Sequence, residues 1–526
     1  MLFFSISGLV ALIVLAYLVG IPLIEKKIVS QLKQLEPEVL ISYSSLHVHL
    51  FDAAVGLDDV DIRFIPNLQE KRYHHTLHIH QLRLSGIDFF ALIRGKELKA
   101  RLLKLDNADI VLDGALLHKE QPLPSGLMKR LHLSIEKIFL SRIETQDMRI
   151  SVDSGGQNQI RMRADLVLQE FGLNNLKDTF SKRDIQFSSV NGILTDISLP
   201  ISGTLHKLHI KTLTFNSEEK SASIQSLEII PDYNKFEIGK RFASQIDYVD
   251  ARIPEIRIMD FDWNSLLDNK IKARKIIVGK TIVYIFRDRR LPRLSTNQPL
   301  PLKYLNSLPF DLRIDTLEVD PSSITYEEFP AKGDQTGILK IERMRLFAAP
   351  FINHPGIGDP EELITKVKGA IMGAGEVAAT LFMAMKTKGD CLVKGEFNNL
   401  DLTTLNSSAE HLGGFHIESG ILNSLGFQFQ FNEEKSSGEV VGEYHNLIID
   451  KLRETEKHRG EKDLVKSFLL QKLVIPKDKD KSLPIAKRSG KINYKHDPTR
   501  FISFYLLKSL LSGVKASFNF GFVLPG

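Results

Sequence analysis

The residues best suited to chemistry are histidines in the first quarter of the chain. Half of the 16 histidines precede residue 133, and two H-x-H pairs occur there, His47 with His49 and His78 with His80. On a strand, such a pair points both rings to one face, where they could bind a metal ion. These rings fall on the polar side of alternating strands, and spacing places no carboxylate beside them. We therefore expect solvated histidines and no metal site.

Two glycine motifs match nucleotide-binding loops only superficially. IVGKT from Ile277 has Arg274 where a phosphate-binding loop needs glycine, and GAGEVA from Gly373 lacks the α/β context of a dinucleotide fingerprint. Cys391 is the only cysteine, which excludes an internal disulfide framework and a multi-cysteine zinc site. No Ser-His-Asp or Cys-His signature is local. We expect no cofactor, no catalytic residues and no enzyme, with a dispersed-site envelope enzyme as an alternative.

Composition favours an elongated repeat over a single core. The chain has 526 residues, of which 25% are charged, with a net charge of +5 and a pI near 8.9. This length exceeds one ordinary core. The mild basic excess suits an anionic membrane and does not indicate nucleic-acid binding.

An eight-residue pattern, apolar-x-apolar-x-x-apolar-x-apolar, recurs through the first two-thirds of the chain. Random order would give roughly two strict matches at this composition. The sequence has seven: VGLDDVDI from Val55, LHIHQLRL from Leu77, LHIKTLTF from Leu208, ASIQSLEI from Ala222, ARIPEIRI from Ala251, LRIDTLEV from Leu312 and LKIERMRL from Leu339. Three looser copies begin at Leu98, Leu133 and Ile271.

The pattern predicts curved strands with one apolar face. A period of two puts alternate side chains on opposite faces, and the doubled x breaks this phase. A β-bulge supplies one extra residue, which keeps the apolar set on one face while it bends the strand. An ordinary β-sandwich is the alternative, because its core is also lined by alternating strands.

Two larger blocks resemble each other at an offset in the 170s, which indicates a duplicated architecture. GIDFFALIRGKELKAR, within the run from Leu77, is matched by DFDWNSLLDNKIKAR, within the run from Ala251. In each block Asp88 or Asp262 precedes an aromatic and apolar segment, which predicts a short inserted helix with that aspartate as its cap. Such units can stack into one continuous sheet.

The N-terminal segment predicts a membrane anchor. Leu2–Ile24 is uncharged, rich in Leu, Ile, Val and Phe, and about 35 Å long as a helix, which is enough to cross a bilayer. A cleaved signal peptide is the alternative, but the basic n-region and the small-x-small cleavage site are missing. We assign residues 1–24 to a transmembrane anchor, 25–40 to a helical neck, 41–355 to a repeated β body and 356–526 to a C-terminal β region.

The C-terminal region contains further strands and two expected helices. We expect strands in VKGAIMGAGEVAATLFMAM from Val367, and a hairpin from FQFQF at Phe427 through NEEKSS to GEVVGEYHNLIID at Gly438. DLVKSFLLQKL from Asp463 predicts a helix before Pro476, and Pro498–Gly513 predicts an amphipathic helix with Gly513 as its C-cap. The last helix could contact a membrane or partner, or pack on the β body. Its expected contact residues are Arg500, Phe501, Phe504, Lys508, Leu511 and Lys515.

With these features the chain resembles the AsmA-type family of envelope proteins, which belong with the repeating β-groove lipid-transfer proteins. The anchor and the LHIKTLTF-like strands contribute to the likeness, which covers nearly the whole chain. It looks most like the uncharacterised AsmA-related branch through KGEFNNLDLTTLN from Lys394, SGILNSLGFQFQFN from Ser419, GEYHNLIIDKL from Gly442 and FISFYLLKSLLSGVKASF from Phe501. The chain is short beside the largest members.

The resemblance implies an inner-membrane anchor with a cytoplasmic N-terminus, a periplasmic body, and phospholipid movement for outer-membrane lipid homeostasis. An outer-membrane or periplasmic protein is a candidate partner. The fold expected is mainly β, an elongated curved groove whose apolar face is shielded by acyl chains. The repeat predicts lipid contact at Leu208, Ile210, Leu213, Phe215, Leu312, Ile314, Leu317 and Val319. A membrane-anchored scaffold or assembly factor with an internally filled β body is the alternative.

Overall fold

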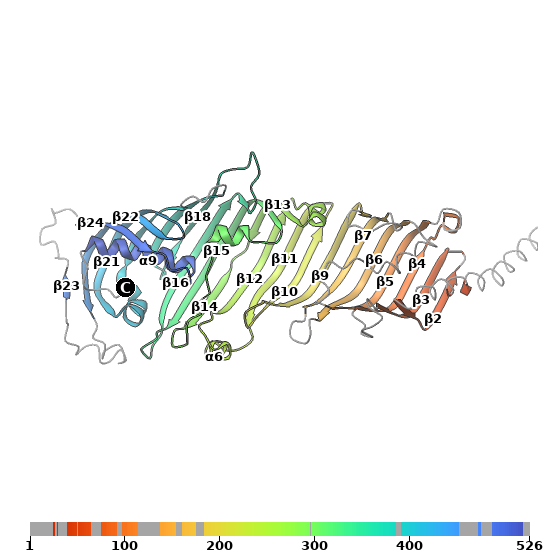
Figure 1. Cartoon of the computed structure of the whole chain (residues 1–526), viewed down its shortest axis with the longest axis horizontal. Coiled ribbons are helices and arrows are strands. Elements are labelled where there is room, and N and C mark those ends of the chain that lie inside the picture. Colours follow the sequence, from red (N-terminus) through yellow and green to blue (C-terminus); the bar gives the residue numbers. More distant parts are fainter. Residues whose placement is uncertain are drawn as a thin grey trace, which may run out of the picture. The chain divides into compact units, whose positions relative to one another are not determined.

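The protein is mainly β and divides into two compact units. The structure, a computed structural model, describes residues 25–26, 29, 39–49, 51–64, 75–91, 97–113, 137–153, 160–174, 184–294, 296–385, 391–451, 472–474 and 486–518. Unit 1 comprises Met1–Pro200 and Leu208–Ile224, and unit 2 comprises Ile201–Lys207 and Gln225–Gly526. Figure 1 shows the strands of each unit lying side by side. The expected anchor, Leu2–Ile24, lies outside the described residues and stays a prediction.

Unit 1 is a sheet in which neighbouring strands are antiparallel except for the parallel pair β5–β6. The short strands β1 and β2 both pair with β3, and β8 and β9 both pair with β7. The strands are β1 Val39–Ser42, β2 Ser45–His49, β3 Ala54–Phe64, β4 His75–Ser85, β5 Glu97–Asp113, β6 Lys137–Asp153, β7 Ile160–Leu173, β8 Ile185–Gln186 and β9 Ser189–Pro200. β10 His206–Asn216 and β11 Ser221–Pro231 straddle the division between the units.

Unit 2 is also a mixed sheet. β13 and β14 both pair antiparallel with β12 and parallel with β15, and all later pairs are antiparallel. The strands are β12 Tyr248–Met259, β13 Lys270–Val278, β14 Ile282–Asp288, β15 Asp311–Phe329, β16 Gly337–Ala349, β17 Phe351–Ile352, β18 Glu362–Ile371, β19 Gly375–Ala384, β20 Cys391–Asp401, β21 Phe415–Phe431, β22 Lys435–Lys451, β23 Lys472–Val474 and β24 Ala486–Lys495.

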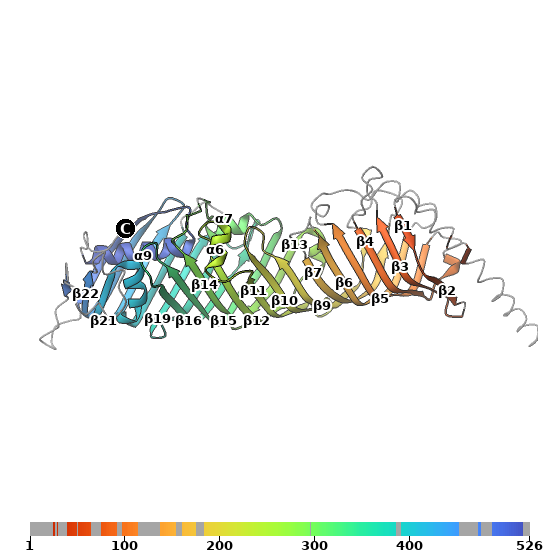
Figure 2. The same cartoon turned by 90° about the horizontal axis from the view of Figure 1, so that it is seen from below.

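Short helices connect the strands of unit 2, and one longer helix follows the last strand. They are α6 Glu237–Phe242, η3 Trp263–Asp268, α7 Pro301–Asn306, η4 Leu402–Leu405, α8 Asn406–Ser408, η5 Ala409–Gly413 and α9 Ile502–Ser517. Figure 2 shows α7 and α9 on the same side of the strands of unit 2. Both helices supply side chains to one hydrophobic cluster.

The duplication expected from sequence is present. In each unit an aspartate and a short helical turn separate an antiparallel strand from a parallel strand pair. Asp262 accepts a hydrogen bond from the backbone N–H of Ser265 at the start of η3, and Asp88 accepts from the N–H groups of Phe90 and Ala91. The parallel pair that follows is β5–β6 in unit 1 and β13–β15 in unit 2.

The β-bulge expectation is confirmed in one of the seven strict repeats, LKIERMRL on β16. Asp59, Ser226 and Arg343 occupy the second residue of the doubled x and have left-handed backbone with φ between 47° and 53°, but the pairing of β3 with β4 passes Asp59 without an extra residue. At Arg343 the pairing of β16 with β18 gains one residue between Glu342 and Arg345, which is a bulge. Within the described residues, six further strands contain a left-handed residue: Asn107, Asp147, Glu170, Asp196, Asn399 and Asn446.

The repeats on β4, β10, β12 and β15 contain no left-handed residue. On β4, β12 and β15 the pairing also passes through the repeat without an extra residue, so the bulge expected on these three strands was wrong. On β4 the phase still breaks, because His80 and Gln81 are both exposed while Ile79 is buried. The left-handed Asp59 of the neighbouring β3 lies at this level, between the pairs Asp58–Gln81 and Val60–Ile79. The phase break of β4 therefore lies beside a left-handed residue of β3, although β4 itself contains none.

Two other expectations meet different outcomes. The strands from Val367 and the hairpin from Phe427 are confirmed as β18–β19 and β21–β22. The helix expected from Asp463 lies mostly outside the described residues, but its last two residues form β23 with Val474, so that part of the prediction was wrong. Pairing with β22 supplies the backbone hydrogen bonds that a helix would have supplied.

The bulge at Arg343 predicts a stability difference between two exposed arginines of β16. Arg343→Val is expected to lower the free energy of unfolding by about 1–2 kcal/mol, because a β-branched residue is strained in left-handed backbone. Arg343→Gly should be tolerated, and Arg345→Val, on the same strand with ordinary backbone, serves as the control. Urea unfolding midpoints measure the effect, and equal midpoints for the two valine variants would contradict the bulge.

Candidate functional site

One face of the sheet in unit 2 is apolar across many strands. Residues directly opposite each other on paired strands have side chains on the same face, so the register of the paired strands traces rows of neighbouring side chains. One row contains Val278, Val319, Leu346, Val367, Ala379, Gly395, Phe427, Val440 and Gly490. A second contains Ile276, Leu317, Ala348, Thr365, Leu381, Val393, Phe429, Gly438 and Ile492. Thr365 is the one polar side chain in either row.

The opposite face of the same strands is largely polar. The row between the two apolar rows contains Glu318, Phe347, Lys366, Thr380, Lys394, Gln428, Glu439 and Lys491. Glu318 forms an ion pair with Lys275 at 2.8 Å. The alternation expected of the repeat is therefore present, and it extends into the C-terminal strands.

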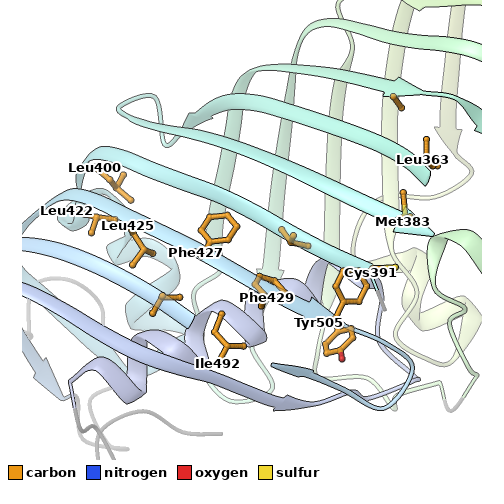
Figure 3. Packing of buried hydrophobic residues seen from close by; sticks show 14 of the residues in the cluster. Leu363, Met383, Cys391, Leu400, Leu422, Leu425, Phe427, Phe429, Ile492 and Tyr505 are labelled. Carbon is orange, nitrogen blue, oxygen red and sulfur yellow. The ribbon is translucent and has the colours of Figure 1, made fainter. Parts of the chain in front are cut away.

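Burial along the apolar face is uneven. Phe429 is 1% exposed and Val440 is 0% exposed, and Figure 3 shows Phe427, Phe429 and Ile492 on the face against which α9 packs. Leu317 and Val319, on β15, are only half-buried. The protein's own side chains fill the C-terminal end of this face, and the β15 end keeps apolar surface in contact with solvent.

The C-terminal helix packs on the apolar face through small residues. An added Cβ at Gly490 of β24 would lie 2.0 Å from the carbonyl oxygen of Gly513, so helix and strand are in backbone contact. Ser509, with 0% exposure, shares a hydrogen bond of 2.7 Å with the hydroxyl of Ser436. Tyr505, 1% exposed, donates to the carbonyl oxygen of Asn432 and stacks on His496. The buried stripe is thus Tyr505, Ser509 and Gly513.

This packing corrects the helix bounds expected from sequence. The helix begins at Ile502 and ends at Ser517, so Gly513 is inside it and is not the C-cap. Residues 497–500 form a turn instead of the first helical turn, because the side chain of Asp497 accepts from the N–H of Thr499. Gly513 is needed for close approach, since a Cβ there would lie 2.7 Å from Ile492.

The expected contact residues of the helix lie mainly outside its buried stripe. Phe501 and Leu511 are 47% and 37% exposed, and the remaining four are half-buried. The Arg500 guanidinium lies 4.8 Å from the ring centroid of Phe504, and the Lys508 ammonium lies 5.5 Å from it. Lys515 lies in the last turn of α9.

Polar contacts join the start of α9 to the segment after β14. Arg293 donates to Asp497 over 2.6 Å, and the N–H of Gln298 donates to the carbonyl oxygen of Pro498 over 2.6 Å. Burial would raise the pKa of Asp497, but hydrogen bonds from Arg293 and Thr499 outweigh it and lower that pKa to about 2. The ion pair therefore stays charged well below neutral pH.

Sequence reasoning missed a polar network on β14 and β15. Arg287 donates two hydrogen bonds of 2.6 Å to Asp247, and Glu328 accepts from Arg289 at 3.0 Å and from Tyr326 at 2.5 Å. Burial and then the charge of Glu328 raise the pKa of the Tyr326 hydroxyl. No local motif signals this network, because its members come from three segments that the antiparallel pairing of β12 with β14 and the parallel pairing of β14 with β15 bring together.

A second network, on the neighbouring positions of the same strands, consists of a lysine, a glutamate and a tyrosine. Lys235 donates to Glu327 at 2.9 Å, and Tyr284 donates to the same carboxylate. Burial and then this hydrogen bond raise the pKa of Tyr284 to about 12. Burial would raise the pKa of Glu327, but its hydrogen bonds lower it below the ordinary value. The carboxylate stays ionised and the phenol protonated, as in a structural ion pair.

Unit 1 repeats the apolar face. One row contains Val55, Leu84, Leu103, Ile143, Leu168 and Val190, and another contains Leu57, Leu82, Leu105, Thr145, Leu166 and Gly192. Ile210 of β10 is 8% exposed, Leu208, Leu213 and Phe215 are half-buried, and Lys211 is exposed. The ring of Phe215 lies against Gly192, where an added Cβ would be 2.9 Å from it. The first four predicted groove residues are thus grouped in unit 1.

The other four predicted groove residues lie in unit 2. Ile314 is 6% exposed, and Leu312 and Leu317 pack against the cluster under α9. Val319 pairs with Val278 and Leu346. The first set of four thus lies along β10 and the second along β15, where the pairing with β13 passes from Ile314 to Leu317 without an extra residue.

The histidines lie on the polar face, as expected, and the structure places carboxylates of a neighbouring strand beside three of them. Asp58, Asp59 and Asp61 of β3 pair with His47, His80 and His78 at 2.9, 2.8 and 3.1 Å. Cross-strand register places them there, and spacing along one strand cannot show this. Hydrogen bonds from Ser45 and then His47 lower the pKa of Asp58, and one from His80 lowers that of Asp59. The described residues hold no cluster of three or more metal-ligating side chains.

Comparison with known proteins does not assign a family. No protein-family model matches the chain, and no curated protein matches it. Within the described residues, no helix is long and apolar enough to cross a membrane.

The contact between α9 and β24 predicts a strong effect of one methyl group. Gly490→Ala is expected to lower the free energy of unfolding by about 1–3 kcal/mol, because its Cβ would meet backbone of α9. Gly426→Ala, whose Cβ would meet only the carbonyl oxygen of Val441 at 4.0 Å, is the matched control. Thermal unfolding and the rate of proteolysis within α9 measure the effect. Equal behaviour of the two variants would show that α9 does not pack on β24.

Proposed function

We propose that the apolar sheet face binds the acyl chains of phospholipid and that this binding forms a lipid-conducting groove. The observation that carries the proposal is the pair of apolar rows in unit 2, buried beneath α9 and only half-buried at β15. Apolar surface of this extent is costly to leave in water, and acyl chains match its chemistry. The similar rows in unit 1 support the same role.

The proposal includes an anchor and a compartment. Leu2–Ile24 would span the inner membrane, and the body would lie in the periplasm and act in outer-membrane lipid homeostasis without being an enzyme. The resemblance to AsmA-type proteins supports this arrangement. An outer-membrane or periplasmic protein would be the acceptor.

A scaffold with an internally filled β body is the second candidate. Its specific support is the end of unit 2 beneath α9, where Phe429, Phe431 and Val440 are almost completely buried by protein side chains. If the whole apolar face were filled in this way, lipid would have no access to it. The two candidates therefore differ in what touches the half-buried side chains.

Photo-crosslinking tests which candidate is right. A photoreactive amino acid in place of Leu213 or Leu317 is expected to capture phospholipid in cells, because Leu317 lies in an apolar row and Leu213 is the corresponding position of the repeat on β10. The same amino acid at Lys211 or Glu318, on the other face, should capture none. Leu213→Asp should keep its melting temperature and lose lipid transport, with Lys211→Asp as control. Lost stability without any lipid adduct would favour the filled scaffold.

The anchor is tested by topology. Protease added to spheroplasts is expected to digest the body, and the mature protein should retain its N-terminal segment, because no cleavage site precedes Glu25. Immunoblotting and N-terminal sequencing provide the measurement. A body protected in intact spheroplasts contradicts the periplasmic orientation, and a mature N-terminus near residue 25 contradicts the anchor.

A further inference from the structure

Positively charged side chains gather where α9 begins in unit 2. They come from the end of β14, from the segment that follows it, from α9 and from the turn before α9, and they are Arg287, Arg289, Arg293, Arg500 and Lys508. Three of them have a carboxylate partner: Arg287 has Asp247, Arg289 has Glu328 and Arg293 has Asp497. The positive charges of these three arginines are therefore compensated by carboxylates.

Arg500 and Lys508 are not compensated in this way. Neither forms an ion pair with a described carboxylate, and the Nε of Arg500 is buried without a hydrogen-bond acceptor. A buried donor without an acceptor is unfavourable, and an anion at this position would relieve it. Both cations lie on the ring of Phe504, at 4.8 and 5.5 Å from its centroid. Both charged groups therefore lie close to one aromatic ring.

The pKa shifts agree with a local excess of positive charge. Burial first, and then Arg293 and two other arginines, lower the pKa of Arg500. Burial first, and then Lys515 and other cations, lower the pKa of Lys508. The nearest carboxylates, Asp497 and Glu328, make the smallest contributions and already serve other arginines.

The chemistry of the pair and of its surroundings favours a phosphate carried by a lipid. A guanidinium offers a planar set of donors that fits phosphate oxygens, and an ammonium adds a point charge. Phe501 and Leu507 are each 47% exposed, and Leu511 is 37% exposed, so apolar surface on the same helix can accompany the headgroup. Free phosphate would use the cations but not these side chains.

We propose that Arg500 and Lys508 bind the phosphate of a phospholipid headgroup beside the ring of Phe504. This inference rests on the proposed lipid function, because the acyl chains would continue onto apolar surface of the same unit. It goes further by assigning the headgroup to two residues. The site recognises the phosphate and leaves the rest of the headgroup unspecified.

Binding of short-chain lipids to the full-length protein in detergent tests the site. The probes are dihexanoyl phosphatidylglycerol, dihexanoylglycerol without phosphate, and inorganic phosphate. In the variant R500Q/K508Q, affinity for the phospholipid is expected to fall at least about tenfold, because charge-assisted hydrogen bonds are lost. The control K487Q/K491Q removes the same charge from exposed lysines of β24 and should bind as the parent does.

Each outcome decides one question. Unchanged phospholipid affinity in R500Q/K508Q overturns the site, and inorganic phosphate binding as tightly as the lipid overturns the lipid assignment. If the unmodified protein does not bind dihexanoylglycerol, the result contradicts the proposed function. Binding that depends on the lipid phosphate would still support the site in that case. R500K keeps the charge and loses the planar donors, so an intermediate affinity is expected even if the double variant folds poorly. Affinity of R500K equal to that of the parent would contradict the role of the guanidinium.

Discussion

The apolar face of each sheet must be kept from water, and most other features of the structure relate to this constraint. The side chains of a strand alternate between the two faces of the sheet. Every second residue therefore stays on the same face only as long as the strand contains no irregularity. Where the phase breaks on β3 and β16, a left-handed residue lies at the break, Asp59 or Arg343, and at Arg343 it accommodates one extra residue. Polar residues suit these positions because both lie on the solvated face. The apolar rows continue on either side of the break.

Unit 2 shows two ways of satisfying the constraint within one sheet. Beneath α9, side chains such as Phe429 and Val440 are covered by the protein itself. Near β15, Leu317 and Val319 are covered only in part. A closed core needs a second layer of protein over each stretch of sheet, whereas a bound acyl chain can cover a row of side chains without adding any protein. In the proposed function, acyl chains cover the half-buried part.

Local pattern was enough to predict the strands, the hairpin of β21 and β22, and the capping role of Asp262, because each depends on residues close together in sequence. Features that depend on pairing between distant segments were missed. The aspartates beside the histidines, the Arg287–Asp247 pair and the backbone contact of Gly490 with Gly513 all require the register of separate elements. Gly513 illustrates the ambiguity, since a glycine can end a helix or allow close approach within one.

The close contact of α9 has a consequence for its charged side. Because Gly513 meets Gly490 and Ser509 bonds to Ser436, the helix cannot slide or rotate without losing buried contacts. Arg293, held to Asp497, fixes the turn that precedes the helix. The positions of Lys508 on α9 and of Arg500 in the turn before it are therefore set by this packing. Cations held in place by packing bind an anion with little additional ordering, which is the physical basis for strong recognition by few residues.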